Sequence, residues 1–177
     1  MPGEQAVFTL ADSPHATAAR SFRSIGKALS DLLPAAEVEH VGSTAVAGCI
    51  GKGDIDVLVR VHEPDFAAAV HALDSLLARS ARNEASATYV EYDWRDGPDS
   101  ASVQLVVAGS SLDDRFHGLK AVLLEDPEAV ERYNSLKLGC VGMPMDAYRE
   151  RKRGLIDELL SSRAGSADAT VRPGVRE

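Results

Sequence analysis

Two acidic residues, Asp54 and Asp56, stand two positions apart in a short segment whose other residues are mainly apolar and β-branched. Because side chains alternate along a β-strand, both carboxylates would lie on one face, about 7 Å apart. Like charges at that spacing repel each other, and a divalent cation bound between them removes the repulsion. Mg²⁺ binds one or two carboxylates and keeps its other positions for water and substrate phosphates. We therefore predict that Asp54 and Asp56 bind Mg²⁺ and take part in catalysis.

The turn Gly42-Ser43-Thr44 lies a short spacer upstream of this acidic pair. Glycine permits a close approach of the backbone, and backbone N–H groups together with the two hydroxyls can hold phosphate oxygens at a helix start. An Asp-x-Asp pair on its own is also typical of a solvated strand edge. The turn, the short spacer and the wholly apolar opposite face (Ile55, Val57, Val59 and Val61) favour a metal and phosphate site.

A Gly-Ser turn, a short spacer and an acid-apolar-acid strand are together typical of the nucleotidyltransferase superfamily. Within it, the chain resembles the GrpB-like proteins. The similar segments are residues 38–48, 51–56, 104–110 with Arg115, 126–128 with 133–137, and 148–152. The similarity extends over residues 8–162, and it implies the superfamily's fold.

The resemblance also implies that Tyr133, Lys137 and Lys152 bind substrate, with the lysines directed at a triphosphate. Tyr133 and Lys137 are four residues apart, as are Tyr148 and Lys152, so each pair occupies one face of a helix. The alternative is that the tyrosines pack and the lysines extend along the surface to reach water.

Two other cations, Lys52 and Arg115, are further candidates for substrate binding. Lys52 lies just before Asp54, where its compact ammonium would neutralise phosphate charge. A plain loop lysine is the alternative. Arg115 belongs to the similar segments and is given the same role.

A third acid is not evident on the strand expected at 102–108, where the resemblance would place one. This strand carries Gln104, where many GrpB-like relatives have a histidine; an amide can bind substrate but cannot accept a proton. Glu91 on the neighbouring strand is the best substitute, because it shares one face with Tyr89 and Asp93. The alternative for Glu91 is a solvated edge residue.

Composition limits the function further. The chain has 177 residues, 45% of them hydrophobic and 26% charged, which is ordinary for one globular domain. A net charge of −8 argues against a nucleic-acid-binding protein. No segment is long and apolar enough to span a membrane, and no secretory signal is seen, so we expect a cytoplasmic protein with Cys49 and Cys140 reduced.

Hydrophobic periodicity predicts an α+β fold: a small mixed sheet with helices packed on it and a helical C-terminal segment. We expect strands at 36–42, 54–61, 87–94 and 102–108, the last two forming an antiparallel hairpin. Helices are predicted from Ser13-Pro14 to Pro34, from Pro64, and at 112–124, 126–139 and 146–162. Residues 1–162 would form one domain, and residues 163–177 a disordered tail.

These residues lead to one preferred function and one alternative. The preferred function is Mg²⁺-dependent transfer of a nucleotidyl group from a nucleoside triphosphate to a small acceptor. The intact Asp54/Asp56 pair favours this enzyme. The alternative is a non-catalytic module of the same fold that binds a nucleotide or a phosphorylated metabolite, which the missing third acid favours.

Overall fold

The computed structural model describes residues 6–11, 15–95 and 100–169, with side chains up to residue 163. A five-stranded mixed sheet forms its centre, in the order β1-β2-β5-β4-β3. Strands β2 and β5 are parallel, and the other neighbours are antiparallel. The strands are β1 (Glu37–Val41), β2 (Ile55–Val61), β3 (Ala78–Arg79), β4 (Tyr89–Trp94) and β5 (Ala101–Val107).

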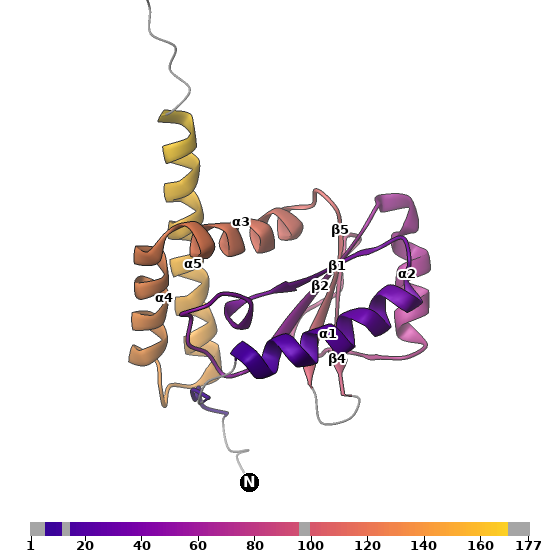
Figure 1. Cartoon of the computed structure of the whole chain (residues 1–177), viewed down its shortest axis with the longest axis horizontal. Coiled ribbons are helices and arrows are strands. Elements are labelled where there is room, and N and C mark those ends of the chain that lie inside the picture. Colours follow the sequence, from indigo (N-terminus) through magenta and orange to yellow (C-terminus); the bar gives the residue numbers. More distant parts are fainter. Residues whose placement is uncertain (1–5, 12–14, 96–99, 170–177) are drawn as a thin grey trace, which may run out of the picture.

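Helices cover both faces of this sheet. The helix α1 crosses the sheet and α2 lies towards one end of it, whereas α3, α4 and α5 stand together at the opposite end (Figure 1). The helices are α1 (His15–Leu32), α2 (Phe66–Asp74), α3 (Ser111–Glu125), α4 (Pro127–Gly139) and α5 (Met145–Ala169). Short 3₁₀ turns, η1 (Ser43–Ala45) and η2 (Glu63–Asp65), follow β1 and β2. None of the helices in the described ranges is long and apolar enough to cross a membrane.

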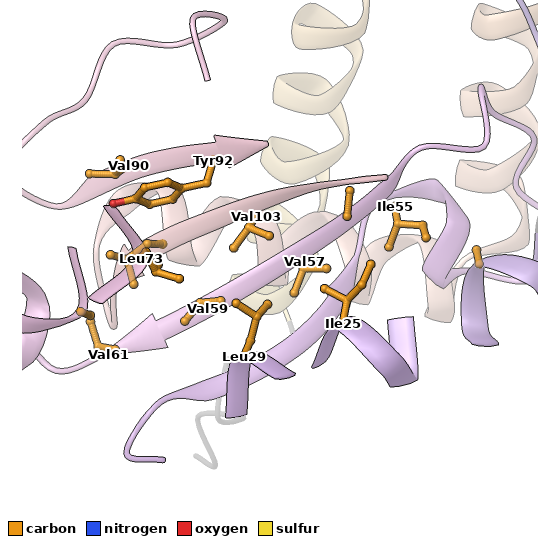
Figure 2. Packing of buried hydrophobic residues seen from close by; sticks show 14 residues of the cluster. Ile25, Leu29, Ile55, Val57, Val59, Val61, Leu73, Val90, Tyr92 and Val103 are labelled. Carbon is orange, nitrogen blue, oxygen red and sulfur yellow. The ribbon is translucent and has the colours of Figure 1, made fainter. Parts of the chain in front are cut away.

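The main hydrophobic core lies between the apolar face of β2 and the helices α1 and α2. Ile25 and Leu29 of α1 project towards this face (Figure 2), and all the residues of the cluster are buried. The strand side of the contact consists of Ile55, Val57, Val59 and Val61. Burying such side chains stabilises the fold by about 1.5–3 kcal/mol each. The predicted apolar face of β2 is therefore confirmed, and the alternate residues, including Asp56, point to the other face.

That other face is closed over only part of its area. Helix α3 packs Leu112 and Phe116 onto a small cluster that includes Leu58 and Val106. Helices α3, α4 and α5 share a separate core, so they form a unit that stands against the sheet. A cavity remains between this unit and the end of the sheet where Asp54 and Asp56 lie.

The α+β fold class and the hairpin of β4 and β5 are confirmed, although residues 96–99 of its connection lie outside the described residues. The short strand β3 was not predicted, because two residues give no periodic signal. Helix α5 continues to Ala169, past the predicted end at residue 162. Ser13-Pro14 and residues 170–177 of the predicted tail fall outside the described residues.

Candidate functional site

A cavity of about 390 Å³ lies between the sheet and the C-terminal helices. The sheet and its loops provide the acidic and amide side chains, and the helices provide most of the cationic ones. Of the twelve residues predicted for the site, all but Thr44 and Lys137 line it: Gly42, Ser43, Lys52, Asp54, Asp56, Glu91, Gln104, Arg115, Tyr133 and Lys152.

Asp54 and Asp56 lie at the start of β2, one just before the strand and one within it. The Asp54 carboxylate is half-exposed and forms an ion pair with Lys52, whose Nζ is 2.5 Å from Oδ2. Burial raises the pKa of Asp56; nearby Asp54 and Glu91 raise it further, while Lys152 opposes the rise. A cation bound at this pair would relieve the excess of negative charge, and carboxylate oxygens are ligands that Mg²⁺ prefers. The residues present therefore fit Mg²⁺.

The turn after β1 brings Gly42 and Ser43 to the acidic pair. Gly42 has a φ of 73° and a ψ of −172°, a conformation that is essentially confined to glycine. A Cβ at this position would lie 2.2 Å from Oδ2 of Asp56, so the turn and the carboxylate are in direct contact. A phosphate bound to the turn would therefore lie next to the acidic pair.

Thr44 has a different role from the one predicted. It is buried, it does not line the cavity, and its hydroxyl donates a 3.0 Å hydrogen bond to the backbone carbonyl of Asp54. The imidazole of His40 lies 3.0 Å from the same hydroxyl. Thr44 thus fixes the backbone that carries Asp54, and its hydroxyl does not face the position where a phosphate would bind.

A chain of hydrogen bonds runs across the sheet from Asp56 to Glu91. Gln104 of β5 lies between them: its Nε2 is 3.4 Å from Oδ1 of Asp56 and 3.3 Å from Oγ of Ser102. The Ser102 hydroxyl then donates to Oε1 of Glu91 over 2.6 Å. Oε1 of Gln104 is buried and has no hydrogen-bond partner among the described residues.

Glu91 lies on the same face as Asp56, but β5 separates their two strands. Four donors surround its buried carboxylate: Ser102, Arg82 with Nη2 at 3.0 Å, Tyr89 with its hydroxyl at 3.3 Å, and Asn83. Within the part of the chain that the structure describes, no three His, Cys, Asp or Glu side chains gather to hold a metal ion. Glu91 thus lies in the cavity wall without joining the Asp54/Asp56 pair as a third metal ligand.

Lys152 of α5 faces the acidic pair from the helical side of the cavity. The Tyr133 phenol is the largest cause of a raised Lys152 pKa, with further contributions from Asp56 and Tyr148, while burial opposes them. The ammonium is therefore charged at neutral pH and interacts with Tyr133, Tyr148 and Asp56. Arg115 of α3 also lines the cavity, but it forms an ion pair with Asp157 of α5.

Lys137 is placed behind the cavity wall. It is only 1% exposed, its Nζ is 4.0 Å from the centre of the Tyr133 ring, and it does not line the cavity. Both the predicted contact with a triphosphate and the alternative of a surface lysine disagree with this position. The helical spacing placed Lys137 beside Tyr133 correctly, but Tyr133 reaches the cavity, whereas Lys137 packs against the loop before β2.

Several cavity residues were not predicted: Arg82, Asn83, Ser102, Arg149 and Arg153. Ser102 had a usable signal, because alternation along β5 places it on the same face as Gln104. Arg82 and Asn83 come from the irregular connection between β3 and β4, which carries no motif. Only the pairing of β4 with β5 brings that connection to the site.

Comparisons with known proteins agree on one family. The family model described as GrpB protein matches residues 12–162. A UPF0157 protein of Vibrio cholerae is 31% identical over 162 residues, which cover 89% of this chain and 84% of the relative. The crystal structure of GrpB from Enterococcus faecalis has a TM-score of 0.66 at 21% identity, covering 89% of this chain and 99% of that one.

A more distant similarity concerns the fold alone. A structure of the Cid1 poly(U) polymerase, a mutant bound to MgATP, has a TM-score of 0.50 at 12% identity. The match covers 75% of this chain but only 43% of the polymerase. The chain therefore belongs to the GrpB family, and its fold is that of the nucleotidyltransferase superfamily.

Proposed function

We propose that this protein is a Mg²⁺-dependent nucleotidyltransferase that uses a nucleoside triphosphate and a small acceptor. The observation that carries the proposal is the contact between the Gly42-Ser43 turn and the Asp56 carboxylate, in a cavity whose opposite wall holds Lys152. Hydrogen-bond donors for a phosphate, acidic side chains that can bind a metal, and a lysine ammonium thus face the same cavity. The net charge of −8 supports a small acceptor over a nucleic acid.

Each residue has a role in this proposal. Asp54 and Asp56 would hold Mg²⁺, which when bound neutralises phosphate charge at the reacting phosphorus. The Ser43 hydroxyl and the turn's backbone would hold phosphate oxygens, and Lys152 would stabilise the departing pyrophosphate. Lys52, Gln104, Arg115 and Tyr133 line the remaining space.

The transfer also requires a base. The acceptor's oxygen forms a bond to the α-phosphorus, the bond to the bridging oxygen breaks, and pyrophosphate leaves with that electron pair. The acceptor's proton must then pass to a base, and we assign this role to Glu91. To accept the proton, Glu91 has to give up one of its four donors, and Arg82 and Asn83 are the ones on an irregular connection.

The first experiment is calorimetric titration of the protein with ATP, in the presence and absence of Mg²⁺. ATP is the first probe because Cid1, which shares the fold, has been seen with MgATP. A ligand at a hundredfold excess over its Kd stabilises the native state by about 2.7 kcal/mol, so thermal shifts provide a parallel measurement. Other nucleoside triphosphates follow in the same assay.

Asp56→Asn tests the metal site. Because the carboxylate is buried close to Asp54, the amide should leave the melting temperature unchanged or raise it, while Mg²⁺-dependent ATP binding is lost. Asp31→Asn, which removes an exposed acid paired with Lys27, is the control and should bind normally. A clearly lower melting temperature with ATP binding intact would refute the assigned metal site.

A non-catalytic nucleotide-binding module remains the second candidate, because four donors already occupy the Glu91 carboxylate. The two candidates differ in pyrophosphate release from ATP, with a small-molecule cell extract supplying the acceptor. In the enzyme, Glu91→Gln abolishes release and preserves ATP binding. In the module, the unmodified protein binds ATP and releases no pyrophosphate.

A further inference from the structure

Helix α4 holds the loop before β2 at two neighbouring backbone positions. The Lys137 ammonium donates a hydrogen bond of 2.5 Å to the carbonyl of Ile50. One turn earlier, the amide of Asn134 accepts from the N–H of Ile50 at 2.9 Å and donates to the carbonyl of Gly48 at 2.8 Å. Two side chains of one helix thus satisfy three backbone groups of this loop.

The loop is in turn packed against Ser43. A Cβ placed on Gly51 would lie 2.7 Å from Oγ of Ser43 and 3.7 Å from Nζ of Lys137. Gly51 and Ser43 both line the cavity, whereas Lys137 lies behind them. A layered contact therefore leads from the buried ammonium through the Ile50-Gly51 backbone to the hydroxyl at the phosphate-binding turn.

Burial of a lysine at this position has a free-energy cost. Burial, together with the neighbouring Lys152, lowers the pKa of Lys137 to about 7. The contact with the Tyr133 ring and the hydrogen bond to Ile50 are the interactions that offset the lost hydration. An apolar residue of similar length would fill the space without this cost. The presence of an ammonium is therefore best explained by its hydrogen bond to the Ile50 carbonyl.

We propose that Lys137 is a positioning residue that holds the Ile50-Gly51 backbone against Ser43 and so sets the phosphate-binding turn, without itself touching the ligand. This inference rests on the proposed function, because it assumes that the turn binds phosphate. It gives Lys137 and Lys152 different tasks: Lys137 acts through the backbone, and Lys152 acts directly from the cavity wall.

The test compares Lys137→Met with Lys152→Met in titrations with MgATP at several salt concentrations. Lys137→Met should weaken binding about tenfold, the size expected for a supporting residue behind a ligand site. The slope of log Kd against log salt concentration should stay as in the unmodified protein, since no charge contact is lost. Lys152→Met should weaken binding and flatten the slope. A flattened slope in Lys137→Met would overturn the positioning role.

A double-mutant cycle tests whether Lys137 affects MgATP binding through Ser43. If Lys137 acts through Ser43, then Ser43→Ala should weaken MgATP binding less in the Lys137→Met background than in the unmodified protein. Additive losses would overturn the proposal. Lys120→Met, which removes a lysine of α3 paired with Glu39, is the matched control and should be additive with Ser43→Ala.

Hydrogen exchange of the unliganded protein separates this inference from the proposed function. Lys137→Met should accelerate exchange of the Ile50 amide by about tenfold relative to Lys120→Met, because one of the two α4 side chains that hold the loop, Lys137 and Asn134, is removed. Unchanged exchange would overturn the positioning role even if MgATP binds. If exchange accelerates and the unmodified protein binds no nucleotide, the proposed function fails and the attachment of the loop by Lys137 stands.

Discussion

The backbone of Gly42 lies directly against the carboxylate of Asp56, so that an added Cβ would stand 2.2 Å from Oδ2. Gly42 also has a φ of 73°, at which side chains are rarely tolerated. One glycine therefore meets two independent requirements, the shape of the turn and the room for the acid. The turn and the Asp56 carboxylate are therefore in direct contact, and a side chain at position 42 would displace the carboxylate.

Gly42→Ala should abolish Mg²⁺-dependent ATP binding, because the methyl group displaces the Asp56 carboxylate. Backbone strain at this φ should also lower the free energy of unfolding by about 1–3 kcal/mol. Titration calorimetry gives the first effect, and thermal melting gives the second.

Gly109→Ala is the control that separates the effect of backbone strain from the effect of displacing the Asp56 carboxylate. Gly109 has a similar φ of 77°, but a Cβ added there would have nothing within 4 Å of it among the described residues. Its alanine variant should lose stability and still bind MgATP. If the two variants bind equally well, the contact between Gly42 and Asp56 has no functional role.

Strand β2 shows why much of the fold could be predicted. Ile55, Val57, Val59 and Val61 alternate with charged residues at two of the three intervening positions, and a period of two is typical of a β-strand with one buried face. The carboxylates of Asp54 and Asp56 therefore had to share a face. Glu91 could also be predicted, because it lies on the expected hairpin of β4 and β5. Its partners Arg82 and Asn83 could not, since they lie on an irregular connection that carries no motif.

The surroundings of Lys137 and Thr44 could not be predicted from the sequence. A helical period places Lys137 beside Tyr133, but it does not reveal whether that face borders a cavity or a packed loop. Both outcomes occur on neighbouring helices, since Lys152 lines the cavity and Lys137 does not. Thr44 likewise lies in the expected turn, where its hydroxyl binds the Asp54 backbone instead of facing the cavity.

Gln104→Glu should make the stability of the protein depend on Mg²⁺. The amide Nε2 lies 3.4 Å from Asp56, and a carboxylate in its place would add a like charge at close range. We expect a lower melting temperature in EDTA, by about 2–4 °C for each kcal/mol lost, and a larger rise on adding Mg²⁺ than in the unmodified protein. Gln104→Met loses the same hydrogen bonds without adding charge, and an equal response to Mg²⁺ in both variants would contradict the prediction.

Lys137 should make the stability of the folded protein increase with pH above pH 7. Its pKa is about 7 in the folded protein against an ordinary value of 10.5, so between these values the unfolded chain binds a proton that the folded chain does not. The Lys137 contribution to stability therefore rises with pH across this window and is constant below it. Lys137→Met removes the contribution, and its melting temperature minus that of the unmodified protein should decrease from pH 7 to pH 8.5.

The buried thiol of Cys49 is the main group that could obscure this effect. Burial raises its pKa above 9.0, so its contribution falls with pH where that of Lys137 rises. Both proteins should therefore be compared in a Cys49→Ala background, with Lys120→Met as the control for loss of a lysine elsewhere. For each variant, the melting temperature minus that of the Cys49→Ala protein is plotted against pH. If this difference is as independent of pH for Lys137→Met as for Lys120→Met, the buried ammonium keeps its proton from pH 7 to pH 8.5 and the prediction is wrong.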